Sequence, residues 1–117
     1  MVEVDAERNR LKKLVASNPA STKIKLDRNQ LIDVDFSGCP SLAYVEVEKN
    51  RLTDIDLSKN KALIEPDVSR NYLSVLDLSK NPNFQSLVVS HNQMKTLDIS
   101  HNPDFSFVSY VDWRPLF

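Results

Sequence analysis

The hydrophobic and polar positions of this chain repeat with a period of 21 residues. Four asparagines mark the repeat, and apolar residues stand five and three positions before each of them and two, five and seven positions after. Ile24-Lys25-Leu26 alternates apolar and charged side chains, as a half-buried strand requires. Self-similarity at a fixed period of 20 to 50 residues indicates a solenoid. We therefore expect a stack of parallel β-coils that share one core.

The asparagines are the residues we expect to turn the chain. Glycine usually supplies tight corners, yet the chain has a single glycine, Gly38. A buried asparagine side chain can instead bond backbone groups of its own coil and of the adjacent one. A second series follows each first one by ten residues. The two predicted structural ladders are Asn29, Asn50, Asn71 and Asn92, and Cys39, Asn60, Asn81 and Asn102.

The period also divides the chain, which is short enough for a single domain over residues 1–117. Residues 24–107 hold four 21-residue repeats, and 108–117 form a C-terminal cap. Residues 1–23 match the repeat as a degenerate coil with one residue missing, but a capping helix that begins at Asp5 fits residues 4–20 as well. In the second half of the unit, Leu76-Asp77-Leu78-Ser79 alternates too and predicts a short strand on the opposite wall.

The aromatic residues crowd towards the end of the chain. A solenoid has open ends that expose core edges and unpaired strand groups. We expect Phe105, Tyr110 and Trp113 to fold over the last coil as a lid. A hydrophobic patch for a partner or for a second copy of the chain is the alternative.

The repeat unit that begins at Leu87 reads L-V-V-S-H-N-Q-M-K-T-L-D-I-S-H-N-P-D-F. It resembles the leucine-rich repeat pattern L-x-L-x-x-N-x-L, in a short, bacterial-type 21-residue form with nested halves that is similar to internalin-like repeats. The resemblance covers residues 24–107. It implies a leucine-rich repeat solenoid with a strand on each wall and little helix. It also implies a non-enzymatic scaffold that binds a protein partner through the exposed face of its parallel sheet.

Composition and charge limit the kinds of partner and the location that we expect for the protein. The formal net charge of −1 creates no overall field that would attract nucleic acid or an anionic membrane, and no apolar run is long enough to span a bilayer. One cysteine rules out an internal disulfide and favours a reduced, cytoplasmic setting, although a secreted or host-delivered protein whose leader was removed stays open. We expect a protein partner, no nucleic acid, no membrane, and a monomer rather than a dimer.

The outward positions of the first strand in each repeat carry an acidic stripe beside a basic one. The resemblance makes this wall the ligand face, and Tyr72 is its best single anchor because aromatic and arginine residues dominate binding energy. The alternative is a solvated face whose stripes neutralise each other. The candidate partner-binding residues are Lys25, Asp27, Arg28, Glu46, Glu48, Lys49, Arg51, Asp67, Arg70, Tyr72, Val88, Ser90 and His91.

On the opposite wall, aspartates recur at one phase as Asp35, Asp56, Asp77 and Asp98. This acidic ladder could let the protein act as an inhibitor or decoy that occupies a basic, nucleic-acid-binding-like site on another protein. The structural alternative is that the carboxylates bond the serines two residues later or the turn backbone.

No catalytic constellation is visible in the sequence. His91 and His101 lie at different phases of the repeat, and we expect Cys39 to point inward rather than to act as a nucleophile. The calcium-loop, H-E-x-x-H and phosphate-loop signatures are absent from the sequence, so we expect no enzyme activity, no cofactor and no metal.

Overall fold

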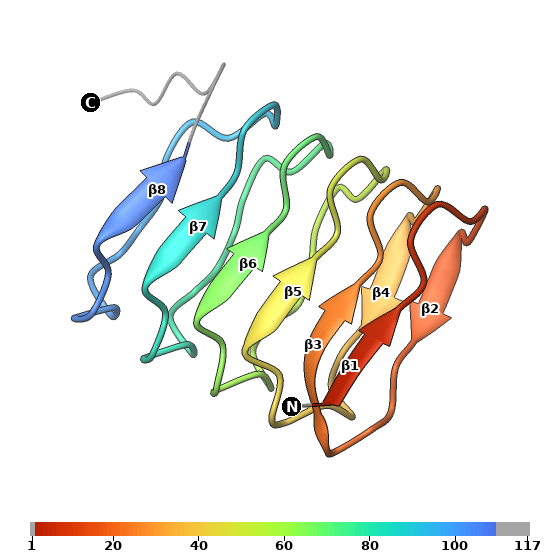
Figure 1. Ribbon diagram of the computed structural model, residues 1–117. Coiled ribbons are helices and arrows are strands. Elements are labelled where there is room, and N and C mark those ends of the chain that lie inside the picture. Colours follow the sequence, from red (N-terminus) through yellow and green to blue (C-terminus); the bar gives the residue numbers. More distant parts are fainter. Residues whose placement is uncertain (1, 110–117) are drawn as a thin grey trace.

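The computed structural model describes residues 2–109 and places them in a solenoid of parallel strands (Figure 1). Helices are absent from that part of the chain, and with them any segment that could cross a membrane as a helix. The six-stranded sheet runs in the order β1 (Val2–Asp5), β3 (Ser21–Lys25), β5 (Tyr44–Glu46), β6 (Glu65–Asp67), β7 (Ser86–Val88) and β8 (Phe107–Ser109). A two-stranded sheet pairs β2 (Lys13–Val15) with β4 (Asp33–Asp35) behind it.

The 21-residue period fixes the strand register. Tyr44 lies opposite Glu65, one full period away, so equivalent positions of successive repeats become neighbours in the sheet. The first coil is one residue shorter, because Val4 pairs with Ile24. Both β1 and β2 lie in the segment for which the sequence allowed either a coil or a helix.

Gly38 lies against the backbone of the first coil. A Cβ atom at this position would lie 2.9 Å from both Cα and Oγ of Ser17 and 3.0 Å from the Ala16 carbonyl oxygen. The backbone of the first coil approaches Gly38 closely, and only a residue without a side chain permits this approach. The one glycine of the chain is thus used for close packing between coils, since its φ is not positive.

The core consists of the apolar columns that the repeat predicts. Leu26, Val47, Val68 and Val89 form one such column and are fully buried. At the two ends the columns have a neighbour on one side only, and exposure rises to 38% at Val4 and 40% at Ile99. Phe105 stacks on Phe84 with ring centroids 5.4 Å apart and so continues a core column. Tyr110 and Trp113, the rest of the predicted lid, lie outside the described residues.

The first asparagine ladder bonds neighbouring coils, as predicted. The Asn50 side-chain amide donates to the carbonyl oxygens of Leu26 in the preceding coil (3.1 Å) and Val47 in its own (3.0 Å). Its Oδ1 accepts the Leu31 backbone N–H at 3.0 Å. The same pattern recurs at Asn29, Asn71 and Asn92.

The second ladder is bonded differently. Asn60 donates to the carbonyl oxygens of Phe36 (2.9 Å) and Cys39 (3.0 Å), and Asn81 and Asn102 repeat these bonds one coil later. The buried Oδ1 atoms of these three asparagines have no hydrogen-bond partner among the described residues. Cys39 fills the equivalent slot of the preceding coil and is fully buried, as predicted.

The strand expected at residues 76–79 is wrong. On the opposite wall only β2 and β4 pair, and the later coils carry no strand there within the described residues. A hollow of about 340 Å³ lies between β4 and the next coil and is lined by Asp33, Val34, Asp35, Ser37, Asp56 and Lys59. The main sheet and the two ladders already tie each coil to the next, and the opposite wall therefore needs no ladder of its own.

Candidate functional site

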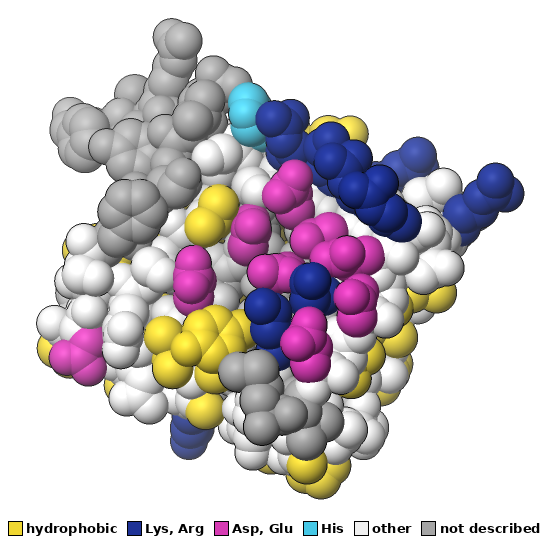
Figure 2. Space-filling model, viewed as in Figure 1, with side chains coloured by type: hydrophobic (Ala, Val, Ile, Leu, Met, Phe, Trp, Pro, Cys, Tyr) yellow, Lys and Arg dark blue, Asp and Glu magenta, His cyan; other side chains and the backbone are white. Residues whose placement is uncertain are grey.

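The exposed face of the six-stranded sheet concentrates negative charge. Figure 2 shows acidic side chains gathered over the first strands, with basic side chains among them and a row of lysines and arginines along one edge. Between residues 5 and 67 the outward positions hold seven carboxylates and two lysines. We call this set the acidic centre; it comprises Asp5, Glu7, Asp27, Glu46, Glu48, Glu65 and Asp67, with Lys23 and Lys25.

The two lysines neutralise only part of this charge. The Lys25 ammonium lies 3.3 Å from Glu7 and 3.9 Å from Asp5, and its hydrogen bond to Glu7 together with the surrounding carboxylates raises its pKa. The Lys23 ammonium lies 3.8 Å from Glu46. Glu46 and Asp67 face each other across adjacent strands, an arrangement of like charges that destabilises a sheet.

Burial and the neighbouring carboxylates both raise the pKa of Asp27. Its partial burial raises its pKa from 3.8 to about 6, and repulsion from Glu46, Asp67 and Glu48 adds to this. A 2.7 Å hydrogen bond from the Glu48 backbone N–H acts in the opposite direction but is outweighed. Carboxylate oxygens of Glu7, Asp27 and Glu46 all lie within 4.8 Å of one another. The two lysines of the acidic centre therefore balance only part of the charge of its seven carboxylates.

A row of basic residues borders the acidic centre at the carboxyl ends of the strands. We call it the basic rim: Arg8, Arg28, Lys49, Arg70 and His91. All five have φ between 55° and 60°, the left-handed conformation in which the chain turns out of the sheet. Glycine or asparagine adopts this conformation at lower cost, whereas long side chains adopt it rarely. Four long cationic side chains and a histidine therefore stand where the backbone favours a small residue.

The structure places most of the predicted partner-binding residues on this face or its rim. Asp27, Glu46, Glu48, Asp67 and Val88 lie half-buried on the sheet wall beside Lys25, and the basic rim follows them. Ser90 lies on the same face but is buried, with 9% of its surface exposed. Arg51 and Tyr72 are exposed but lie beyond the turn, outside the strands.

Sequence reasoning missed one column of the face. Lys23, Tyr44 and Glu65 pair across β3, β5 and β6 and line a hollow on the sheet, but they lie two residues before the Lys25 column, outside the predicted stripes. Glu7 was missed because the first coil is degenerate. Tyr44 and Glu65 could have been found from the 21-residue period. They stand one period apart, each two residues before a predicted outward position, and are therefore the preceding outward positions of their strands.

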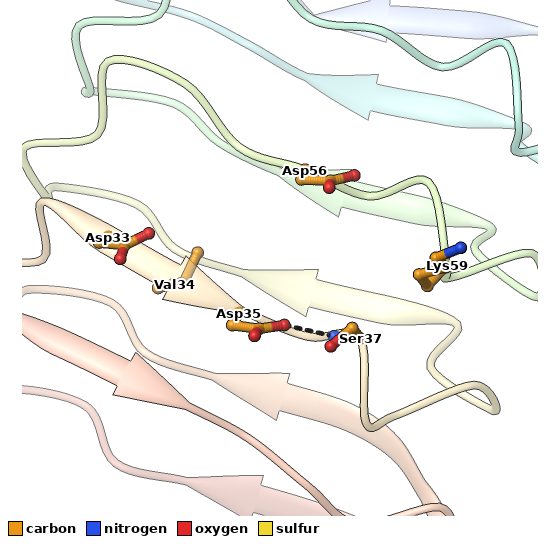
Figure 3. A pocket seen from close by; sticks show the side chains of 6 residues that line it. All are labelled: Asp33, Val34, Asp35, Ser37, Asp56 and Lys59. Carbon is orange, nitrogen blue, oxygen red and sulfur yellow. Dashed lines mark hydrogen bonds between the residues drawn. The ribbon is translucent and has the colours of Figure 1, made fainter.

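The opposite wall has a local structural role. Each ladder aspartate accepts the backbone N–H of the serine two residues later, at 2.8 to 2.9 Å, and hydrogen bonds with that serine lower its pKa. Figure 3 shows this bond between Asp35 and Ser37, with Asp56 and Lys59 on the next coil. Lys59 and Lys80 lower the pKa of Asp56 and Asp77 further. The carboxylates of Asp35, Asp56, Asp77 and Asp98 are thus engaged in holding turns.

Comparison with known proteins identifies the fold. No family model matches the chain, and no curated protein matches it. Among solved structures, the leucine-rich repeat domain of APL1B is 28% identical with a TM-score of 0.60, and the match covers 79% of this chain and 32% of that one. The chain has the leucine-rich repeat fold.

A second solved structure has the same fold. The functional domain of InlJ from Listeria monocytogenes matches with a TM-score of 0.58 and 21% identity, over 76% of this chain and 24% of that one. That domain is described as including a cysteine ladder, whereas Cys39 is the one cysteine of this chain and shares its column with asparagines. The chain spans about a quarter to a third of the length of these two structures.

Proposed function

We propose that this leucine-rich repeat protein is a non-enzymatic module that binds a protein partner through the exposed face of its six-stranded sheet. The observation that carries the proposal is the acidic centre bordered by the basic rim. Its similarity to leucine-rich repeat domains supports a role in protein interaction in general. The partner's identity, a cytoplasmic location, a monomeric state and the absence of nucleic-acid binding stay predictions from the sequence.

Two features favour binding over a merely solvated face. Carboxylates that repel one another, such as Glu46 and Asp67, are stabilised when an oppositely charged surface covers them. The basic rim places long cationic side chains in a left-handed conformation that costs free energy, and a contact made by those side chains would offset that cost. Together the two stripes specify the orientation of a partner as well as its charge.

The decoy role of the opposite wall has less support. Asp35, Asp56, Asp77 and Asp98 each accept a backbone hydrogen bond within their own turn, which explains an aspartate at that phase without a partner. A carboxylate with one oxygen bonded in this way keeps a second oxygen that another protein can reach, so the turns explain the ladder but do not exclude the role. We keep this role as the alternative that the experiment below decides.

Capture of a partner by charge-reversed variants tests the proposal. The sheet variant carries Glu46→Lys and Glu48→Lys, and the matched opposite-wall variant carries Asp56→Lys and Asp77→Lys, which changes the net charge equally. A second opposite-wall variant, Asp33→Lys with Asp54→Lys, leaves the aspartate–serine turns intact. Each is immobilised and exposed to lysate after circular dichroism has confirmed folding. We expect only the sheet variant to lose the proteins that the wild type captures; loss through the opposite wall alone would favour the decoy.

A further inference from the structure

The acidic centre contains one hollow, which lies on the sheet over β5 and β6. It has a volume of about 210 Å³ and is lined by Lys23, Tyr44, Val45, Glu46, Glu65 and Asp67. Tyr44 lies directly opposite Glu65, and Glu46 lies opposite Asp67, so an aromatic ring and three carboxylates surround one depression. Lys23 is the only cation of its lining and is paired with Glu46. Glu65 and Asp67 have no cation within salt-bridge distance among the described residues, while Asp67 Oδ1 accepts the backbone N–H (3.1 Å) and the hydroxyl (2.7 Å) of Ser69.

The size and lining of the hollow limit what it can hold. Small-molecule sites usually occupy about 300 to 1,000 Å³ and are mostly apolar, so this hollow is too small and too charged for one. The carboxylates that do come together within ligand distance of one another, Glu7, Asp27 and Glu46, include only one residue of the hollow, so the hollow is not built around a metal ion. A single long cationic side chain fits both its size and its charge.

Arginine matches this lining better than lysine. A guanidinium group is planar and stacks on an aromatic face such as that of Tyr44, while its five N–H donors can reach several carboxylates at once. A lysine ammonium is a compact point charge that keeps its hydration and makes fewer directed bonds. The hollow offers an aromatic ring together with separate carboxylates on two strands, which is the arrangement that uses the extra donors.

We propose that the hollow receives an arginine side chain from a basic segment of the partner protein, held by Tyr44, Glu65 and Asp67. This inference rests on the proposed function, because it names the chemistry of the partner at the same face. The surplus negative charge of the rest of the acidic centre attracts the basic residues that flank that arginine in the partner.

Fluorescence polarisation with two labelled peptides, hexa-arginine and hexa-lysine, tests the inference. The measurements use the full chain in about 0.1 M salt, where charges are screened beyond roughly 10 Å. Tyr44→Leu removes the ring and keeps an apolar side chain, and Tyr44→Phe keeps the ring. Glu65→Gln removes one carboxylate of the hollow. The matched control is Asp56→Asn, the same charge change on the opposite wall.

The expected results separate the hollow from a general effect of net charge. The wild type should bind hexa-arginine at least about threefold more tightly than hexa-lysine. Tyr44→Leu and Glu65→Gln should each weaken hexa-arginine binding by about two- to fivefold, whereas Tyr44→Phe and the Asp56→Asn control should stay within about twofold of the wild type.

Three results would overturn the inference: no binding of hexa-arginine, equal weakening by Asp56→Asn and Glu65→Gln, or equal affinity for the two peptides with no effect of Tyr44→Leu. If one of these is found while the sheet variant still loses its captured proteins, the arginine site fails and the proposed function stands. If capture is also unaffected by the sheet variant, both fail.

Discussion

Replacing Asn71 with leucine tests how the first asparagine ladder holds the coils together. Asn71 is 4% exposed, and its amide donates to the carbonyl oxygens of Val47 (2.9 Å), Val68 (3.0 Å) and Ser69 (3.1 Å). Its Oδ1 accepts the backbone N–H of Leu52 at 3.0 Å. Leucine has a similar shape but can make none of these bonds.

The cost follows from which groups lose their last partner. The Val47 oxygen keeps a bond from Asn50 and the Val68 oxygen keeps one from Asn92, while the Ser69 oxygen keeps the Lys49 N–H. Only the Leu52 N–H is left buried and without an acceptor. An orphaned buried donor costs about 1–3 kcal/mol, so we expect Asn71→Leu to lower the free energy of unfolding by about that amount.

Asn81→Leu in the second ladder should cost less. The two oxygens that Asn81 bonds, those of Leu57 and Asn60, also accept the backbone N–H groups of Asn60 (3.0 Å) and Leu63 (3.1 Å), so no group is orphaned. The substitution also removes a buried Oδ1 that has no partner among the described residues. We expect a loss of at most about 1 kcal/mol, because only second bonds to oxygens that are already satisfied disappear.

Urea titration followed by circular dichroism measures both effects. At a denaturant slope of about 2 kcal/mol per molar, a loss of about 2 kcal/mol lowers the midpoint by roughly 1 M. Asn83→Leu is the control, since Asn83 is exposed and makes one long bond of 3.5 Å to the Lys61 oxygen, and it should change stability by less than about 0.5 kcal/mol. Equal costs at Asn71 and Asn81, or a larger cost at Asn81, would refute the reasoning.

Three further predictions concern single positions. Cys39 should react slowly with a thiol reagent under native conditions, and Cys39→Asn should leave the urea midpoint nearly unchanged, because the slot holds asparagine in the next three coils; rapid labelling would contradict its burial. Gly38→Ala should destabilise by about 1–3 kcal/mol, since the new methyl group would overlap Ser17 and Ala16, and an unchanged thermal midpoint would show that the first coil can move away. Because the folded protein holds the Asp27 proton more tightly than the unfolded chain does, Asp27 favours folding increasingly as the pH falls from about 7 to about 4. Asp27→Asn should therefore raise stability near pH 7 by about 1 kcal/mol, after allowance for solvent screening of a half-exposed group, and should remove this part of the pH dependence; a variant that is less stable than the wild type at pH 7 would contradict it.

The repeat predicted the solenoid because burial and period determine each other in a stacked coil. Every column of apolar residues must face the same interior, so the columns of the sequence are enough to reveal the core at Leu26 and its equivalents. The asparagine ladder at Asn50 follows from the same logic, because a turn with almost no glycine leaves backbone groups that a polar side chain must satisfy.

What the sequence could not predict depends on backbone bonding and on local geometry. Alternation at residues 76–79 reports which side chains face inward, but it does not report whether the backbone is bonded to a neighbouring coil, and there it forms no strand. The left-handed conformation of Arg28 and Arg70 was not foreseen, since nothing in a basic residue signals it. The hollow at Tyr44 depends on the shape of the sheet surface, which the residue types along a column do not determine.

Carboxyl footprinting of the captured complex tests the binding face most directly. Water-soluble carbodiimide couples an amine to exposed carboxylates, and mass spectrometry then compares labelling of each residue in the free and the bound protein. The two walls serve as internal controls for each other, because both carry exposed or half-exposed acids. We predict that labelling of Glu46, Glu48 and Glu65 falls in the complex while labelling of Asp56 and Asp77 does not change; protection of Asp56 and Asp77 with Glu46, Glu48 and Glu65 still labelled would contradict the account.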